Sequence, residues 1–433
     1  MIATIIISSL TFIGITLSIL FFPHIKIKSA KLDTYWIIAL LGAVILTATT
    51  LCPIKEISSS WTSNTAVNPL KILVLFFSMT ILSIYLDELG LFRFLAAFAV
   101  NKAKGKQYVL FFVLYILVSI LTIFTSNDIV ILTFTPFICF FCKHAKINPL
   151  PYLIAEFAAA NTWSMMFIIG NPTNIYLATS AGITFVEYLK VMLLPTIAAG
   201  LVELLIIFIL FFKKLQEPLN NTEVIKVHID SPIDLVIASF HLLVCLIFLI
   251  ISPYINVEMW LISAICALSL LVCSLIMRVV RKREWVYLGD CFKRLPYQLI
   301  PFVLSMSVIV ITLNYQGVAS KIGEFLNNGV TIINYGASSY LFSNIINNIP
   351  MSILFSNIPS PTDPNYIKAI YASIVGSNIG AFLTPIGALA GIMFSNLLNK
   401  YEVKFSFLDF IKYGSVISIP VLATTLLILG III

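Results

Sequence analysis

Long apolar runs fill almost the whole of this 433-residue chain. A helix that spans a membrane needs about 20 consecutive, mostly apolar residues, and most of the runs approach or exceed that length. Only short polar stretches separate them, so the chain is built to fold within a lipid bilayer. The runs are 2–22, 35–51, 70–86, 108–124, 129–142, 150–182, 187–212, 233–251, 255–277, 298–316, 331–358, 368–398 and 406–433.

The composition excludes the other large classes of protein. Charged residues make up 10% of the chain and apolar residues 60%, whereas a soluble domain carries about 25% charged residues. A soluble enzyme, a secreted disulfide scaffold and a disordered chain are therefore excluded. The net charge of +7 comes from short basic clusters between the runs, which is typical of membrane topology signals. We expect an all-α integral membrane protein with about ten spanning helices, in contact with lipid and not with nucleic acid.

Several absences narrow the function further. The chain has no G-x-x-x-x-G-K-[ST] loop for ATP, so its energy must come from an ion gradient or from a separate ATPase subunit. No paired catalytic side chains and no metal-ligand spacing occur within the runs, so an enzyme is not expected. The seven cysteines lie mostly inside apolar runs and are expected to be core residues. No basic residue precedes the first run, which favours a first span over a cleaved signal peptide.

The basic residues predict which side of the membrane each loop occupies. Lys and Arg mark the cytoplasmic side, and the segments 52–69, 252–257 and 359–367 contain only Lys55. We therefore expect those three segments and the N-terminus outside, in a prokaryotic cytoplasmic (inner) membrane. The clusters expected on the cytoplasmic side are 26–31, 102–106, 143–146, 213–214, 278–283 and 400–404.

One apolar stretch, 107–142, joins two clusters that are predicted to lie on the same side. Two full spans would need about 40 residues and a turn, so the stretch is too short. A re-entrant hairpin that turns near the middle of the membrane, at 125–128, resolves the conflict. Polar, non-helical backbone at that depth is tolerated where it lines a cavity or is buried in protein.

The same pattern recurs later in the chain. A second hairpin is expected at 331–358, with a polar turn at 343–350, and it should enter from the outside. Each hairpin is followed by a broken helix, at 150–182 and at 368–398. We therefore expect an inverted-topology repeat, a plan in which secondary transporters place the substrate between paired broken helices. Its parts are residues 1–212, a cytoplasmic linker at 213–232 and residues 233–433.

The candidate site lies where these helices break. Broken helices expose backbone groups that can hold ions, and the side chains there are mainly Ser, Thr and Asn, which supply neutral donors and acceptors. Asp128 is the one carboxylate at a tip and the expected coupling group, as a proton carrier or a Na⁺ ligand. Neither tip nor break contains Lys or Arg, which disfavours citrate-like substrates. No cofactor other than a bound Na⁺ is expected. The candidate binding residues are Ser126, Asn127, Asp128, Asn161, Asn171, Thr173, Asn174, Asn344, Asn347, Asn348, Ser377, Asn378 and Thr384.

Three sequence elements resemble a known family. SNDIVILTFTPF (126–137), SNIINNIPMSILFS (343–356) and GSNIGAFLTPIGALA (376–390) are similar to motifs of arsenical pump membrane subunits. These belong to the ion transporter superfamily, together with sodium/proton antiporters and divalent anion/sodium symporters. GNPTN (170–174) resembles the Gly-x-Pro-x-Asn of other branches of the superfamily. The resemblance implies an inverted-repeat transporter whose site is formed by the hairpin tips and broken helices, and whose members often form homodimers.

We therefore predict a secondary active transporter. Arsenite or antimonite efflux, coupled to proton influx, is the first hypothesis. The alternatives are a sodium-coupled transporter of an organic or inorganic anion, of the citrate or dicarboxylate type, and a sodium/proton antiporter. An ion channel is disfavoured because an internal inverted repeat favours alternating access. A homodimer and a separate ATPase subunit are the protein partners that the sequence leaves open.

Overall fold

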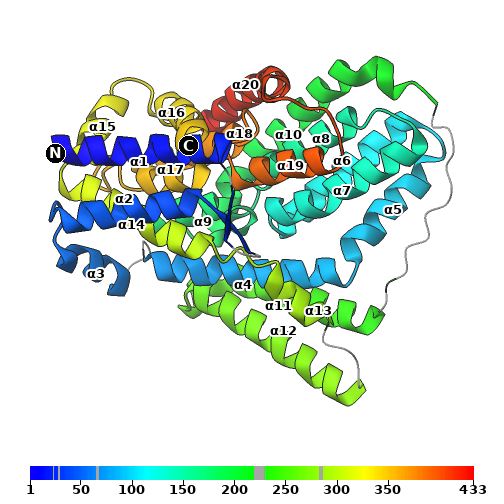
Figure 1. Ribbon diagram of the computed structural model, residues 1–433, viewed down its shortest axis with the longest axis horizontal. Coiled ribbons are helices and arrows are strands. Elements are labelled where there is room, and N and C mark those ends of the chain that lie inside the picture. The colour runs from blue at the N-terminus through cyan, green and yellow to red at the C-terminus, as the bar shows by residue number, and fades with distance from the viewer. Residues whose placement is uncertain (23, 28–29, 65–67, 219–228, 230, 282–285) are drawn as a thin grey trace.

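The computed structural model describes residues 1–22, 24–27, 30–64, 68–218, 229, 231–281 and 286–433. These residues form twenty α-helices, one short 3-10 helix and two strands (Figure 1). The predicted helical membrane protein is confirmed, with one exception. Strands β1 (His24–Ile27) and β2 (Ala30–Asp33) pair antiparallel after the first helix, where only a basic cluster was expected. Most of the expected linker 213–232, and Lys28, Lys282 and Arg283 of the basic clusters, lie outside the described residues.

Eight of the described helices are long and apolar enough to cross a membrane. A ninth span arises if α14 (Leu299–Tyr315) and α15 (Val318–Leu326), which are bent by 77°, count as one. The count is thus eight or nine rather than about ten. The eight helices are α1 (Ile2–Phe21), α4 (Pro69–Glu88), α6 (Gln107–Phe124), α7 (Asn127–Ala145), α10 (Phe185–Leu215), α11 (Pro232–Ile255), α12 (Met259–Arg281) and α20 (Phe407–Ile432). The first expected hairpin, 107–142, appears as α6 and α7, and each of these helices is by itself long and apolar enough to span, because the turn between them takes up only two residues. The bent pair in the described residues that could be re-entrant is α14–α15, which was not predicted.

The count is lower because polar breaks divide the other apolar runs into helices too short to span. Run 150–182 forms α8 (Leu150–Trp163), η1 (Ile168–Gly170) and α9 (Pro172–Ser180). Run 331–358 forms α16 (Thr331–Ile346) and α17 (Asn348–Phe355), and run 368–398 lies within α18 (Tyr366–Gly380) and α19 (Leu389–Lys400). The remaining short helices are α2 (Tyr35–Ala48), α3 (Ile54–Thr62), α5 (Leu91–Ala103) and α13 (Val286–Lys293).

Helices α4–α10 and helices α14–α20 form two series with the same order of elements. Each set has an apolar helix, a short helix, a pair with a tight break, a pair with a wider break and a long closing helix. The short helices α5 and α15 both begin after a glycine in the left-handed region, at φ 86° and 72°. The closing helices α10 and α20 both begin with a capping box, Thr184 with Glu187 and Ser406 with Asp409. This reciprocal cap satisfies free backbone N–H groups at a helix start.

Packing brings the helix breaks together. Helix α6 packs on α8 and α16 on α18, while α7 packs on α19 and α17 on α9. The second arm of each pair therefore contacts the broken helix of the other set, and α10 lies along α20. The α16–α18 contact is especially close, because a Cβ atom added at Gly376 would lie 2.2 Å from the carbonyl oxygen of Gly336.

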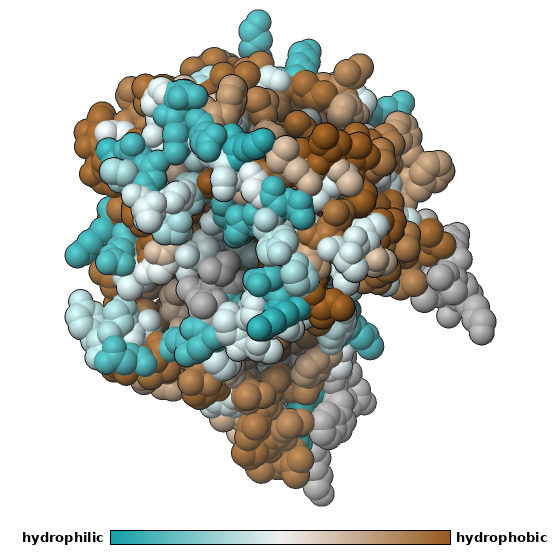
Figure 2. Space-filling model, turned by 90° about the vertical axis from the view of Figure 1, so that its left-hand side faces the viewer, coloured by the Kyte–Doolittle hydropathy of each residue, from teal (hydrophilic) through white to brown (hydrophobic). Residues whose placement is uncertain are grey.

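The surface fits a protein embedded in lipid. Figure 2 shows the end of the molecule where α1 begins. Hydrophilic residues gather around a central hollow, and hydrophobic residues lie toward the outer edge of the molecule. Helices α11 and α12 pack together and against α4 along the lower side of Figure 1. Large apolar side chains are exposed on α11 and α12 and also on α10 and α20, which a soluble monomer would avoid. Examples are Ile209, Val236, Val279 and Leu427.

Candidate functional site

The tip between α6 and α7 contains three of the predicted residues. Ser126 precedes α7, and Asn127 is its first residue. The side-chain oxygen of Asn127 accepts from the backbone N–H of Asp128 at 3.0 Å. Its amide nitrogen donates to Oδ1 of Asn161 on α8 at 3.1 Å. Asn127 and Asn161 are buried, so this bond attaches the tip to the broken helix α8–α9.

The break between α8 and α9 is held by its own polar side chains. Asn171 caps α9, and its side-chain oxygen accepts from both N and Oγ1 of Thr173 at 3.1 Å. Asn174 donates its amide to the carbonyl oxygen of Ser164 at 2.8 Å. The hydroxyl of Ser377 on α18 donates to Thr173 Oγ1 at 3.3 Å. These bonds satisfy groups that an interrupted helix leaves without partners.

Asn378 of α18 joins the two sets of helices at this point. Its side-chain oxygen accepts from Ser164 Oγ and from Asn171 Nδ2, each at 3.0 Å. Its amide nitrogen donates to Asn174 Oδ1 at 2.6 Å. All four side chains are buried. Residues more than 200 positions apart therefore form one hydrogen-bonded cluster between the α8–α9 break and α18.

The tip between α16 and α17 is attached to the α18–α19 break. Asn347 lies in the left-handed region with φ 73°, and its amide donates to the carbonyl oxygen of Ile386 at 2.9 Å. The backbone N–H of Asn348 donates to the carbonyl oxygen of Gly387 at 3.0 Å. Asn347 and Asn348 are buried, so this tip is closed by bonds to main-chain oxygens.

Two further predicted residues hold the same break. The hydroxyl of Thr384 donates to Asn344 Oδ1 at 2.7 Å, and the amide of Asn344 donates to the carbonyl oxygen of Gly380 at 2.9 Å. The thirteen predicted residues thus lie at the breaks, and most of their polar atoms bond to the protein itself. Only Ser126 and Asp128 among them line the cavity described next.

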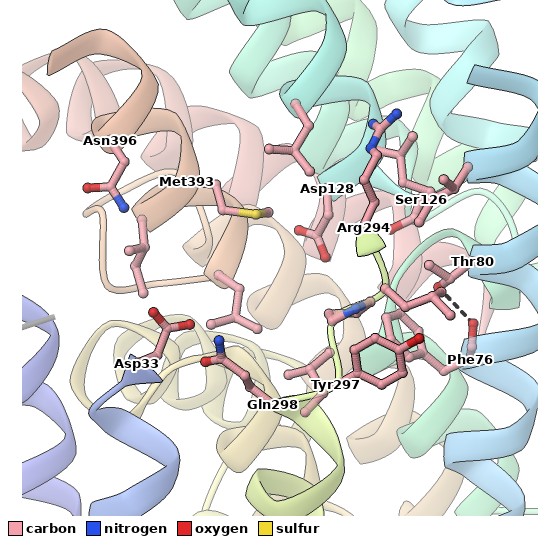
Figure 3. Close-up of a pocket in the computed structure, with 18 of the residues that line it drawn as sticks. Asp33, Phe76, Thr80, Ser126, Asp128, Arg294, Tyr297, Gln298, Met393 and Asn396 are labelled. Carbon is pink, nitrogen blue, oxygen red and sulfur yellow. Dashed lines mark hydrogen bonds between the residues drawn. The ribbon is translucent and has the colours of Figure 1, made fainter. Parts of the chain in front are cut away.

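A cavity of about 360 Å³ lies beside the first tip. Figure 3 shows the carboxyl group of Asp128 directed into it, with Asp33, Gln298 and Asn396 facing it from other sides. These residues come from α7, from β2, from the segment before α14 and from α19. A volume of several hundred cubic ångströms is typical of a small-molecule site.

Asp128 has a distinctive electrostatic setting. It lies in the first turn of α7, where the helix dipole favours a negative charge. No Lys, Arg or His side chain within the described ranges forms an ion pair with it. Its charge is therefore available to a proton or to a cation in the cavity.

Two cationic side chains also line the cavity, and both are paired. Arg294 forms ion pairs with Asp87, at 2.7 Å, and with Glu88. Asp87 also accepts a hydrogen bond from Thr133 of α7 at 2.7 Å. Lys293 pairs with Asp290 at 2.9 Å. The tips and breaks themselves contain no Lys or Arg. The cavity beside the first tip is nevertheless lined by Lys293 and Arg294.

The sequence did not reveal the other walls of the cavity. Asp33 lies beside a basic cluster, and Arg294 and Gln298 lie between two helices, where no period or motif marks them. Asn396 belongs to α19, which follows a recognised motif. Tertiary packing alone brings these residues to Asp128. The sequence held one weak signal of this wall, which is Asp33, an acidic residue close to a basic cluster.

Comparison with known proteins gives consistent relatives. The "Arsenical pump membrane protein" of Escherichia coli is 26% identical over 402 residues, which cover 90% of this chain and 91% of that protein. The protein of the same description in Escherichia coli strain K12 is 28% identical over 368 residues, covering 81% and 84%. The crystal structure of the YdaH transporter of Alcanivorax borkumensis aligns over 99% of this chain and 97% of its own, with a TM-score of 0.53 and 14% identity. That likeness establishes a shared fold.

A family model decides the family. The model described as "Citrate transporter", CitMHS, matches residues 34–368, a range that includes the first tip, the α8–α9 break and the second tip. The predicted superfamily resemblance is confirmed by this match and by the arsenical pump relatives. With its apolar spans and its family known, the chain is a membrane transporter rather than an enzyme, and it belongs to the CitMHS citrate transporter family.

Proposed function

We propose that this chain exports arsenite or antimonite in exchange for protons, with the cavity beside Asp128 as the substrate site. At neutral pH trivalent arsenic in water is the uncharged trihydroxide, a small solute that donates and accepts hydrogen bonds. Neutral polar groups at Ser126, Gln298 and Asn396 line the cavity and suit such hydroxyls. The arsenical pump relatives, matched over most of their length, support the same substrate.

The observation that carries the proposal is the charge of the cavity wall. Asp128 contributes a carboxyl group that forms no ion pair in the described part of the chain, while Arg294 and Lys293 each pair with carboxylates that do not line the cavity. A multiply charged anion would be repelled by such a wall, since like charges close together are costly. The uncharged trihydroxide of arsenic would not be repelled. Cys139 and Cys142 are buried on α7 and do not line the cavity, so the proposal uses hydroxyl recognition and not thiol ligation.

Asp128 is the proposed coupling group. Its carboxyl group lies at the tip and faces the cavity. It can take a proton when the cavity is open to one side of the membrane and release the proton when the cavity is open to the other side. Coupling arises if substrate and proton alternate at this carboxyl. The bonds that hold both tips to broken helices allow each hairpin to move with its neighbours as a unit.

Sodium-coupled transport of an organic anion is the second candidate. The description of the family model supports it, and so does the position of Arg294 and Lys293 in the cavity wall. For citrate to bind, at least one of these cations would have to leave its carboxylate partner. A sodium/proton antiporter would use Asp128 without an organic substrate.

The repeated order of elements supports an inverted repeat, with α4–α10 and α14–α20 as its two copies. The first copy ends at Leu215, three residues beyond the expected half 1–212, and the second lies within 233–433. We place the N-terminus outside an inner membrane, following the basic clusters. Cysteines introduced singly at Lys104 and Lys146, at the two ends of the first hairpin, should then react with impermeant reagents only from the cytoplasmic side. Labelling of one position from each side would contradict a re-entrant hairpin.

Flux into vesicles tests the function directly. The full chain is reconstituted in liposomes, a pH gradient or a sodium gradient is imposed, and arsenite or citrate uptake is measured by elemental or radiotracer analysis. We expect saturable arsenite accumulation driven by the pH gradient, and none in protein-free liposomes. Citrate accumulation driven by sodium, without arsenite transport, would establish the second candidate. A fast arsenite flux that does not saturate would indicate a channel and contradict both.

A further inference from the structure

A second carboxyl group is buried away from the cavity. Glu203 lies on α10, its side chain is fully buried, and it does not line the cavity that contains Asp128. It contacts Tyr115 of α6 and Thr162 of α8. A buried carboxylate is costly unless a counter-charge or several donors compensate it, so the hydrogens available around Glu203 decide its state.

Tyr115 does not have enough hydrogens for its contacts if Glu203 is ionised. Its hydroxyl oxygen lies 2.7 Å from the carbonyl oxygen of Gly200 and 3.0 Å from Glu203 Oε1. A phenol has one hydrogen, and Gly200 is the nearer acceptor. Trp163 Nε1 donates to the same hydroxyl at 3.2 Å and supplies nothing to Glu203. The contact with Oε1 becomes a full hydrogen bond if Glu203 itself carries the hydrogen.

A neutral Glu203 satisfies the whole group. Glu203 then donates to Tyr115, Tyr115 donates to Gly200, and the hydroxyl of Thr162 donates to the other carboxyl oxygen. Each donor has an acceptor, as buried polar groups require. An ionised Glu203 would leave two acceptors competing for one phenol hydrogen in a buried place.

No cation compensates Glu203 within the described part of the chain. None of the ion pairs found there includes it. Tyr115 is the titratable side chain that faces it. Of the neighbouring helices, α8 carries Glu156, which bonds to Thr135 of α7. Three titratable side chains on the other packed helices, α20 and α11, interact elsewhere: Asp409 in its capping box, Tyr413 stacked on Phe211, and His241 bonded to Ser269.

We propose that Glu203 is a second proton-binding site of this transporter, neutral in the conformation described here. Loss of its proton would leave Gly200 and a carboxylate, both on α10, competing for the one phenol hydrogen of Tyr115. Proton release from Glu203 is thereby linked to a rearrangement of the hydrogen bonds that join α6, the first arm of the first hairpin, to α10. The link to transport rests on the proposed proton coupling, whereas the protonation of Glu203 does not.

Infrared spectroscopy tests the protonation without any substrate. The purified full chain in lipid bilayers at pH 7 should show a carbonyl band of a neutral carboxyl group that Glu203→Gln removes. The glutamine amide can donate to Tyr115 and accept from Thr162 as the acid does, so the fold should be retained. Glu217→Gln, at an exposed position just after α10, is the matched control and should keep the band. Identical spectra for the wild type and Glu203→Gln would overturn the proposal.

A second variant guards against misfolding of the first. Tyr115→Phe keeps the acid but removes its acceptor, so the same band should shift in frequency. An unshifted band would show that the neutral acid is another residue and overturn the assignment.

Vesicle measurements then test the link to transport. Glu203→Gln should take up fewer protons per transported substrate than the wild type and should retain downhill exchange. Unchanged proton uptake, with the band lost, would show a proton that stays in place and would overturn the coupling role. If the wild type transports no arsenite, the infrared result still stands on its own.

Discussion

The two hairpin tips have similar positions in the chain but different chemistry. The first tip, at Ser126 to Asp128, presents a carboxyl group to a cavity and bonds to one side chain across from it, Asn161. The second tip, at Asn347 and Asn348, bonds to two main-chain oxygens and lines none of that cavity. The two tips thus differ in what they bond to, although the helices around them follow the same order.

We infer different roles for the two sets of helices, α4–α10 and α14–α20. The first tip has a group whose charge can change, while the second is fixed by bonds that involve the backbone itself. Tighter packing accompanies the second tip, since α16 and α18 approach so closely at Gly376 that a Cβ would clash with the main chain. We infer that the first half binds and responds and that the second half supports it.

Removing the charge at the first tip should have the largest effect on transport. Asp128→Asn keeps the size and one oxygen but cannot bind a proton, so we expect it to abolish pH-driven accumulation and to retain downhill exchange. Flux in reconstituted vesicles measures both. Asp363→Asn, which is outside the cavity, is the matched control and should behave as the wild type. Unchanged coupling in Asp128→Asn would mean that the two tips do not differ in the way described.

Disturbing the tight half should have the largest effect on stability. In Gly376→Ala the new methyl group would lie 2.2 Å from the Gly336 oxygen, and such overpacking costs about 3 kcal/mol or more. Helix α8 holds the place of α18 in the first set, and within it Ala159→Gly, which adds no atom, should cost about 1 kcal/mol. Thermal unfolding in detergent compares the two. Equal losses would show that the two halves are packed alike.

Replacing the asparagine of the second tip should cost more stability than replacing that of the first tip. Asn347→Ala removes the donor to a buried carbonyl and places alanine at φ 73°, for a combined loss of about 2 kcal/mol. Asn347→Gly should recover the part due to backbone strain, because glycine tolerates this region. Asn127→Ala removes the bonds to Asn161 and to the backbone N–H of Asp128, but Asn127 is not at positive φ, so this variant should lose less stability. A Tm for Asn347→Ala above that of Asn127→Ala would reverse the comparison.

A pair outside the cavity sets the baseline. Lys71 and Glu258 form an ion pair at 2.6 Å, with Glu258 about half exposed. Exposed pairs contribute less than about 1 kcal/mol, so Lys71→Gln should change both the Tm and the arsenite flux little. A large effect on flux would show that Lys71, which is not among the thirteen predicted residues and does not line the cavity, takes part in transport.

The sequence predicted the helix breaks well and the cavity poorly. Polar turns inside apolar runs are local signals, and α6 ends, α7 begins, α9 begins and α17 begins within or beside the predicted turns. The bonds made by Asn171, Asn347 and Asn378 follow from those breaks. The cavity walls do not, because Asp33 and Arg294 reach Asp128 only through the packing of distant segments. The expected ligand role of the tip amides was a local inference too, and the structure shows that most of them bond to protein.

The length of α10 has a consequence for the surrounding lipid. This helix has 31 residues, about 46 Å at 1.5 Å per residue, whereas α6 has 18, about 27 Å. The hydrocarbon layer is about 30 Å thick, so α10 must tilt strongly or extend into the headgroups, while α6 can stand nearly upright. Mismatch of this kind is relieved by tilting or by local thickening of the bilayer. The acyl-chain length of the host lipid should therefore change how α10 leans on its neighbours, and with it the rate at which the transporter changes conformation.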